Sequence, residues 1–106
     1  MGKGEHPQGE RVSEGIRKVE REVEVVNELG MHLRAAAEIV KVANRFASEI
    51  HLIKNDEMAN AKSVLNTASL AAPKGTKLVV VAEGPDAEEA VDALAKLFAD
   101  RFGEER

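Results

Sequence analysis

Apolar positions recur along this chain with two different periods, and the changes of period divide the chain into elements. Between residues 19 and 26 the apolar residues stand among charged ones, as in a strand with one buried face, at Val19, Val23, Val25 and Val26. The run at 27–30, which contains Asn and Gly, breaks this strand. A helical spacing follows, at Ala36, Ile39, Val40, Ala43, Phe46 and Ala47. This spacing predicts a helix that begins close to His32.

The second half of the chain continues with shorter segments. Residues 50–54 predict a strand, Asn55-Asp56 a hairpin turn, and residues 57–61 another short strand. Ser63 suits the N-cap of a short helix, with apolar positions at Val64, Leu65, Ala68 and Leu70. The apolar run at 78–82 predicts a buried central strand. Asp86 and Glu89 form a capping-box pattern before a last helix, whose apolar positions are Ala87, Ala90, Val91, Leu94, Leu97, Phe98 and Phe102.

The resulting order is β-α-β-β-α-β-α, which predicts an α+β fold. We expect an open-faced two-layer sandwich, in which a four-stranded antiparallel sheet carries three helices on one face and leaves the other face to water. Residues 1–18 are polar and Gly-containing with no apolar period, so we expect a flexible N-terminal tail. The folded domain is predicted to span residues 19–103.

Composition narrows the class of protein. A chain of 106 residues supports one modest core, which favours a small carrier or binding module over an enzyme with a cleft between domains. The chain has no Cys, no signal-peptide pattern and no apolar run of membrane-spanning length, so we expect a cytoplasmic protein without membrane insertion. A net charge of −4 with interspersed signs, and only three aromatic residues, disfavour nucleic acid as a partner.

His32 is the main candidate for chemistry. It lies where the first strand has ended and the first helix begins, and the unpaired N–H groups and dipole of a helix start favour an anion such as phosphate. Arg34 lies two positions further on and can reach a phosphoryl group with its forked donors. The alternatives are a helix-capping or simply exposed histidine and a solvated arginine.

Several motifs in this order resemble the histidine-containing phosphocarrier (HPr) family of the bacterial phosphotransferase system. The family pattern Gly-Leu-His-Ala-Arg-Pro-Ala stands here as Gly30-Met31-His32-Leu33-Arg34-Ala35-Ala36. The Lys-Ser motif of the family stands here as Asn60-Ala61-Lys62-Ser63-Val64-Leu65. Two further matches precede the last strand and the last helix, at 74–76 and 84–90. Both the sugar-transport branch and the nitrogen branch of the family fit these residues.

The resemblance implies a function for the whole chain. His32 would accept a phosphoryl group on Nδ1 from phosphoenolpyruvate-dependent enzyme I and pass it to IIA domains or proteins, with Arg34 stabilising the phosphate. The protein would be a carrier and not an enzyme, with no cofactor and no metal, and we expect a monomer. Ser63 would be a regulatory phosphorylation site where an HPr kinase/phosphorylase is present, although a plain N-cap explains this residue equally well.

A partner surface is predicted beside His32. The short helix carries more apolar residues than its length can bury, so we expect some of them to form a docking patch for enzyme I and IIA partners, at Ala37, Val64, Leu65 and Ala68. A rival hypothesis is a regulatory interaction module of the same fold that binds partners with this patch and never transfers phosphate. His6 and His51 have no spacing that would form a metal site with His32.

Overall fold

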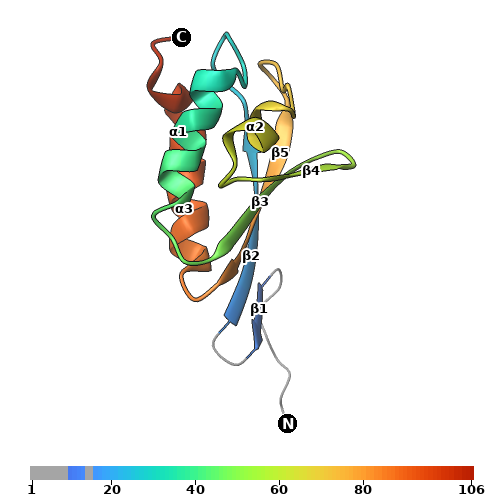
Figure 1. Cartoon of the computed structure of the whole chain (residues 1–106), viewed down its shortest axis with the longest axis vertical. Coiled ribbons are helices and arrows are strands. Elements are labelled where there is room, and N and C mark those ends of the chain that lie inside the picture. Colours follow the sequence, from blue (N-terminus) through green and yellow to red (C-terminus); the bar gives the residue numbers. More distant parts are fainter. Residues whose placement is uncertain (1–9, 14–15) are drawn as a thin grey trace.

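The structure is a computed structural model that describes residues 10–13 and 16–106. In this part of the chain the elements are β1 (Glu10–Ser13), β2 (Ile16–Glu24), α1 (Leu33–Ala43), β3 (Glu49–Lys54), β4 (Glu57–Asn60), α2 (Val64–Ala68), β5 (Lys77–Gly84), α3 (Ala87–Ala99) and the 3-10 turn η1 (Arg101–Gly103) (Figure 1). The predicted order β-α-β-β-α-β-α is confirmed from β2 onward, and β1 precedes it.

The strands form one antiparallel sheet in the order β1-β2-β5-β3-β4. β5 is central among the four predicted strands, because it pairs with β2 on one side and with β3 on the other. This position agrees with its apolar sequence. The hairpin from β3 to β4 turns at Asn55, whose φ of 54° is the left-handed conformation that Asn tolerates.

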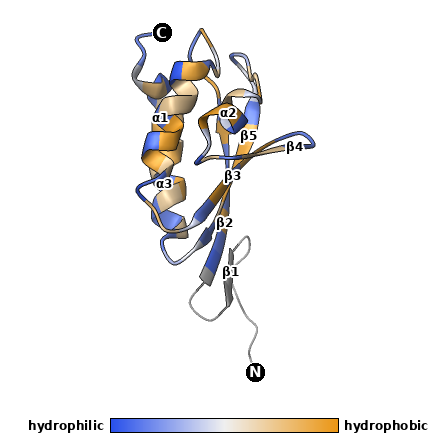
Figure 2. Cartoon of the chain, in the orientation of Figure 1, coloured by the Kyte–Doolittle hydropathy of each residue, from blue (hydrophilic) through white to orange (hydrophobic). Residues whose placement is uncertain are grey.

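The core lies between one face of the sheet and the helices. Along β5, Leu78, Val80 and Ala82 are buried, whereas Val79 and Val81 on the other face are only partly covered. α1 and α3 lie side by side against the sheet, and α2 packs against α1 and β4 (Figure 1). Figure 2 shows both apolar and polar residues on α1 and α3, as expected of helices with one buried face. The predicted open-faced α+β sandwich is therefore confirmed.

The expectation of a flexible tail over residues 1–18 is wrong in part. Residues 1–9 and 14–15 lie outside the described residues, but β1 pairs with the start of β2, and Arg17 and Lys18 pair with Gly84 and Glu83 of β5. The pattern of apolar residues missed this pairing because an edge strand is held by backbone hydrogen bonds, which leave no apolar period. The sheet therefore has a fifth strand.

The first helix is shorter than its apolar spacing predicted. It ends at Ala43, and the C-cap Asn44 donates its backbone N–H and its Nδ2 to the carbonyl oxygen of Val40. Ala47, predicted on the buried face of this helix, is exposed, and Phe46 is partly buried against the core. The apolar spacing extends past the end of the helix because Phe46 packs against the core from the loop that follows the C-cap Asn44.

The predicted capping box at the start of α3 is also wrong. Asp86 occupies the N-cap position but makes no side-chain hydrogen bond to its own helix. Its carboxylate instead accepts from the backbone N–H groups of Ala47 and Ser48, both at 2.9 Å, and from the Ser48 hydroxyl at 2.6 Å. Asp86 therefore ties the start of α3 to the loop after α1.

None of the helices within residues 10–13 and 16–106 combines the length and the apolar character of a membrane span.

Candidate functional site

The loop before α1 is held in place by its backbone. Gly30 has a φ of 74°, and a Cβ at this position would lie 2.7 Å from the carbonyl oxygen of Ala72. Met31 donates its N–H to that same oxygen at 2.7 Å, so the loop lies tightly against the segment after α2. Only glycine fits this close approach and this dihedral angle together. The packing fixes where the next residue, His32, enters the helix.

His32 is the N-cap of α1. Its backbone is extended, and its Nδ1 accepts a hydrogen bond from the backbone N–H of Arg34 at 3.2 Å. The side chain keeps 27% of its surface exposed, so a partner molecule can reach it. Nδ1 therefore lies at the amino end of the helix, where backbone N–H groups and the helix dipole favour an anion.

The other nitrogen of the His32 ring contacts an acidic residue far along the chain. Nε2 is hydrogen-bonded to Oε2 of Glu104, which follows η1. The second oxygen of Glu104, Oε1, accepts from Asn27 Nδ2 at 2.8 Å, and the same Nδ2 donates to the carbonyl oxygen of Gly30 at 2.9 Å. Asn27 is fully buried, and only 14% of the Glu104 side chain is exposed. The three side chains form one chain of hydrogen bonds.

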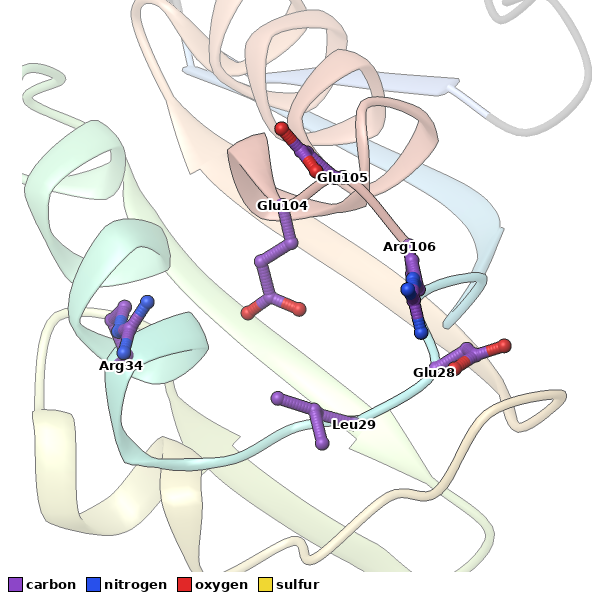
Figure 3. A pocket seen from close by; sticks show the side chains of 6 residues that line it. All are labelled: Glu28, Leu29, Arg34, Glu104, Glu105 and Arg106. Carbon is purple, nitrogen blue, oxygen red and sulfur yellow. The ribbon is translucent and has the colours of Figure 1, made fainter.

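The carboxyl group of Glu104 is held in its charged form. Burial raises its pKa, but the hydrogen bonds from Asn27 and His32 and the nearby charges of His32 and Arg34 outweigh burial, so the pKa lies below the ordinary value of 4.5. Glu104 and Arg34 both line a hollow of about 370 Å³, and Figure 3 shows the Glu104 side chain between Arg34 and Arg106; the other lining residues are Glu28, Leu29 and Glu105. The site therefore offers a carboxylate to Nε2 of the imidazole and a backbone N–H to Nδ1, and the Arg34 side chain lines the hollow beside Glu104.

Among the described residues, no group of three or more His, Asp or Glu side chains could hold a metal ion.

Ser63 is the N-cap of α2, as its sequence position predicted. Its Oγ accepts from the backbone N–H of Asn66 at 3.3 Å, and its side chain is partly buried. The neighbouring Lys62 reaches away from it and donates to the carbonyl oxygen of Phe46 at 2.7 Å. Because α2 packs against α1, Ser63 belongs to the helix next to the one that His32 caps.

The predicted docking residues differ in exposure. Leu65 is 77% exposed and Ala37 is exposed, whereas Val64 and Ala68 are only partly exposed. Two larger exposed apolar residues were missed by the sequence analysis, and these are Leu33 at 60% in the first turn of α1 and Leu29 at 74% in the preceding loop. Leu33 could have been found, because it lies one helical turn before Ala37 and outside the buried stripe of α1.

Glu104 and Asn27 were also missed. Glu104 lies 72 positions from His32 and 77 from Asn27, in a polar segment without any period. Asn27 stood in the run that was interpreted only as the end of a strand. No signal in one sequence indicates that these residues meet.

Comparison with known proteins shows the family to which the chain belongs. Residues 19–100 match the family described as "PTS HPr component phosphorylation site". The chain belongs to the HPr family. The HPr phosphocarrier of Cupriavidus necator is 38% identical over 86 residues, which cover 81% of this chain and 97% of that protein. The phosphocarrier NPr of Shewanella violacea is 36% identical over 87 residues, covering 82% and 96%.

The fold is shared as well. A crystal structure of HPr-C-His from Thermoanaerobacter tengcongensis superposes with a TM-score of 0.78 at 40% identity, covering 82% of this chain and 98% of that one. The resemblance inferred from the motifs is thereby confirmed. As a member of the HPr family, the chain is a phosphocarrier of the phosphotransferase system and is not itself a catalyst.

Proposed function

We propose that His32 is the phosphoryl acceptor of this carrier, and that its Nδ1 takes the group from phosphoenolpyruvate-dependent enzyme I and passes it to IIA domains or proteins. The observation that carries the proposal is the hydrogen bond from the Arg34 N–H to Nδ1, because it identifies Nδ1 as the ring nitrogen at the helix start. Phosphoryl oxygens bonded to Nδ1 would lie close to the unpaired N–H groups of α1. The Arg34 side chain would supply a forked cation to the same oxygens.

Transfer of this kind needs contact with large partners. In an in-line displacement the donor atom, the phosphorus and Nδ1 are nearly collinear, so the ring has to be reachable from outside the domain. The exposed edge of His32 meets this need. We assign docking to the apolar residues around it, with Leu33 and Leu65 as the largest exposed apolar side chains of α1 and α2 and Ala37, Val64 and Ala68 beside them.

We further propose that Ser63 is a regulatory site in a cell that contains an HPr kinase/phosphorylase. A phosphoryl group there would bring nearly two negative charges to the N-cap of α2, next to the docking residues Val64 and Leu65. The helix would tolerate these charges, whereas an apolar partner surface would not. Since phosphoenolpyruvate is a metabolite of the cytoplasm, we place the transfer there.

Transfer of label from phosphoenolpyruvate tests the acceptor. Incubation with enzyme I and phosphoenolpyruvate should add one phosphoryl group to the wild-type chain, in an acid-labile and base-stable linkage. His32→Ala should abolish labelling, and His51→Ala should retain it, since His51 belongs to β3 and lies outside the hydrogen-bond chain of the site. Label that persists in His32→Ala would overturn the assignment. A wild-type chain that binds enzyme I but takes no label would instead support the rival regulatory module.

A further inference from the structure

The bridge between Asn27, Glu104 and His32 uses both oxygens of the Glu104 carboxylate. One oxygen faces the ring nitrogen Nε2 and the other accepts from Asn27, whose buried amide also holds the carbonyl oxygen of Gly30. The Asn27 amide therefore fixes both the carboxylate and the loop that leads to His32. A carboxylate held in this way cannot turn freely, and it determines the orientation of the imidazole plane.

The same bridge determines which ring nitrogen carries the proton. Nδ1 accepts a hydrogen bond from the Arg34 N–H, so in the neutral ring its lone pair is free of a proton. The proton is then on Nε2, which donates to Glu104. The imidazole is thereby prepared for reaction at Nδ1, the nitrogen that faces the start of α1.

The charge of Glu104 matters most during the reaction. As the Nδ1 lone pair forms a bond to phosphorus, the bond from phosphorus to the donor breaks and its electron pair leaves with the donor. The imidazole becomes more positive while its Nε2 keeps the proton, so the hydrogen bond to a carboxylate strengthens. Since this interaction is stronger in the transition state than in the ground state, it accelerates transfer.

We propose that Glu104, held by Asn27, is a positioning residue that keeps His32 in the Nε2–H form and stabilises the imidazole as Nδ1 takes the phosphoryl group. The proposal rests on the proposed function of His32. Glu104, in the polar segment after η1, would then take part in phosphoryl transfer. Its role differs from the one proposed for Arg34, whose side chain would contact the phosphoryl oxygens.

The test compares Glu104→Gln and Glu104→Ala with Glu89→Gln, which removes the same charge from an exposed position in the first turn of α3, outside the hollow. In transfer from enzyme I, both Glu104 variants should lower kcat by roughly tenfold or more while KM for the carrier stays nearly constant. The Nε2 signal of His32 in ¹⁵N NMR should move in both variants. Glu89→Gln should behave as wild type in both measurements.

A second arm uses phosphoramidate, a small phosphoryl donor that needs no enzyme I. The rate at which phosphate appears on Nδ1 should fall in the Glu104 variants and not in Glu89→Gln. If enzyme I fails to label the wild-type chain, the proposed function is wrong, and the phosphoramidate arm still decides the role of Glu104. Wild-type rates in both Glu104 variants, with folding intact by thermal melting, would overturn the inference and leave the bridge as a structural contact.

Discussion

Arg34 contributes to the site through two different groups. Its backbone N–H contacts Nδ1 of His32, and its side chain is exposed and lowers the pKa of Glu104 by its charge. A substitution of the side chain leaves the first contact in place. The two contributions can therefore be separated by mutation.

Arg34→Ala should slow transfer far more than it destabilises the fold. Loss of a charge-assisted contact to the phosphoryl group costs about 1.5–3 kcal/mol, which corresponds to a rate lower by roughly ten- to a hundredfold. The melting temperature should change little, because the side chain is exposed. Arg34→Lys should recover part of the rate, because Lys keeps the positive charge but lacks the paired N–H donors of the guanidinium. If Arg34→Ala unfolds while its folded fraction transfers normally, the residue is structural.

At this scale the sequence predicts the part of the site that is continuous in the chain. His32 and Arg34 stand two positions apart at a helix start, where position alone predicts the chemistry proposed for them. Asn27 and Glu104 act only through contacts made after folding, across 72 and 77 positions, so local pattern carries no trace of them. The second half of the site is therefore a product of packing.

On the proposed function, α2 is the element that links stability and partner binding most directly. It has five residues, its N-cap is Ser63, and the only buried residue in it is Thr67. Much of its apolar surface therefore remains available to partners. A substitution of the N-cap Ser63 can change both the stability of the helix and the binding of partners. Substitutions that keep the cap but add or omit a charge distinguish the two effects.

Ser63→Asp should fold nearly as well as wild type and dock poorly. Asp can cap the helix and its charge suits the dipole, but the charge lies at the edge of the docking residues and should slow phosphorylation of His32 by roughly tenfold or more. Ser63→Asn is the matched control, because Asn caps without a charge and should transfer normally. Ser63→Ala should transfer normally and lose about 1 kcal/mol in urea unfolding. Equal rates for Ser63→Asp and Ser63→Asn would leave Ser63 as a helix cap alone.

Periodicity predicted the existence of these elements better than their ends. The strands β3, β4 and β5 and the three helices follow from apolar spacing, because burial on one face requires that spacing. The end of α1 depends instead on Asn44, whose hydrogen bonds close the helix while the apolar pattern continues. The start of α3 at Asp86 agrees with the prediction, but the Asp86 carboxylate binds the loop after α1 and not its own helix. β1 has no such pattern and was missed.

At the scale of the whole molecule, Asp86 makes stability depend on pH. Its hydrogen bonds from the Ser48 hydroxyl and from the N–H of Ala47 hold its pKa below the ordinary value of 3.8. A carboxyl group with a lowered folded-state pKa stabilises the fold fully above that ordinary value, and the contribution is lost as the pH falls through the folded pKa. The start of α3 and the loop after α1 should separate first in acid.

Asp86→Asn should lower the free energy of unfolding by about 1–3 kcal/mol at pH 7, because a charged acceptor of several hydrogen bonds is replaced by a neutral one. The difference from wild type should shrink below pH 4, where protonation removes the same charge from the wild-type protein. Urea unfolding at pH 7 and pH 3 measures both values. Asp100→Asn, at an exposed position, serves as the control. A constant difference between the two pH values would contradict the role of the charge.

The separation of His32 and Glu104 along the chain also sets an order of events during synthesis. His32 leaves the ribosome 72 residues before Glu104, whose carboxylate contacts it. At about 5–20 residues per second, this delay is roughly 4–14 s. The sheet cannot form before β5 has been made either. β2 pairs with β5, and it does not pair with β3 or β4, which are made earlier. A nascent chain therefore carries His32 for several seconds before its site is finished, and on the proposed function efficient phosphorylation has to wait until Glu104 has been made.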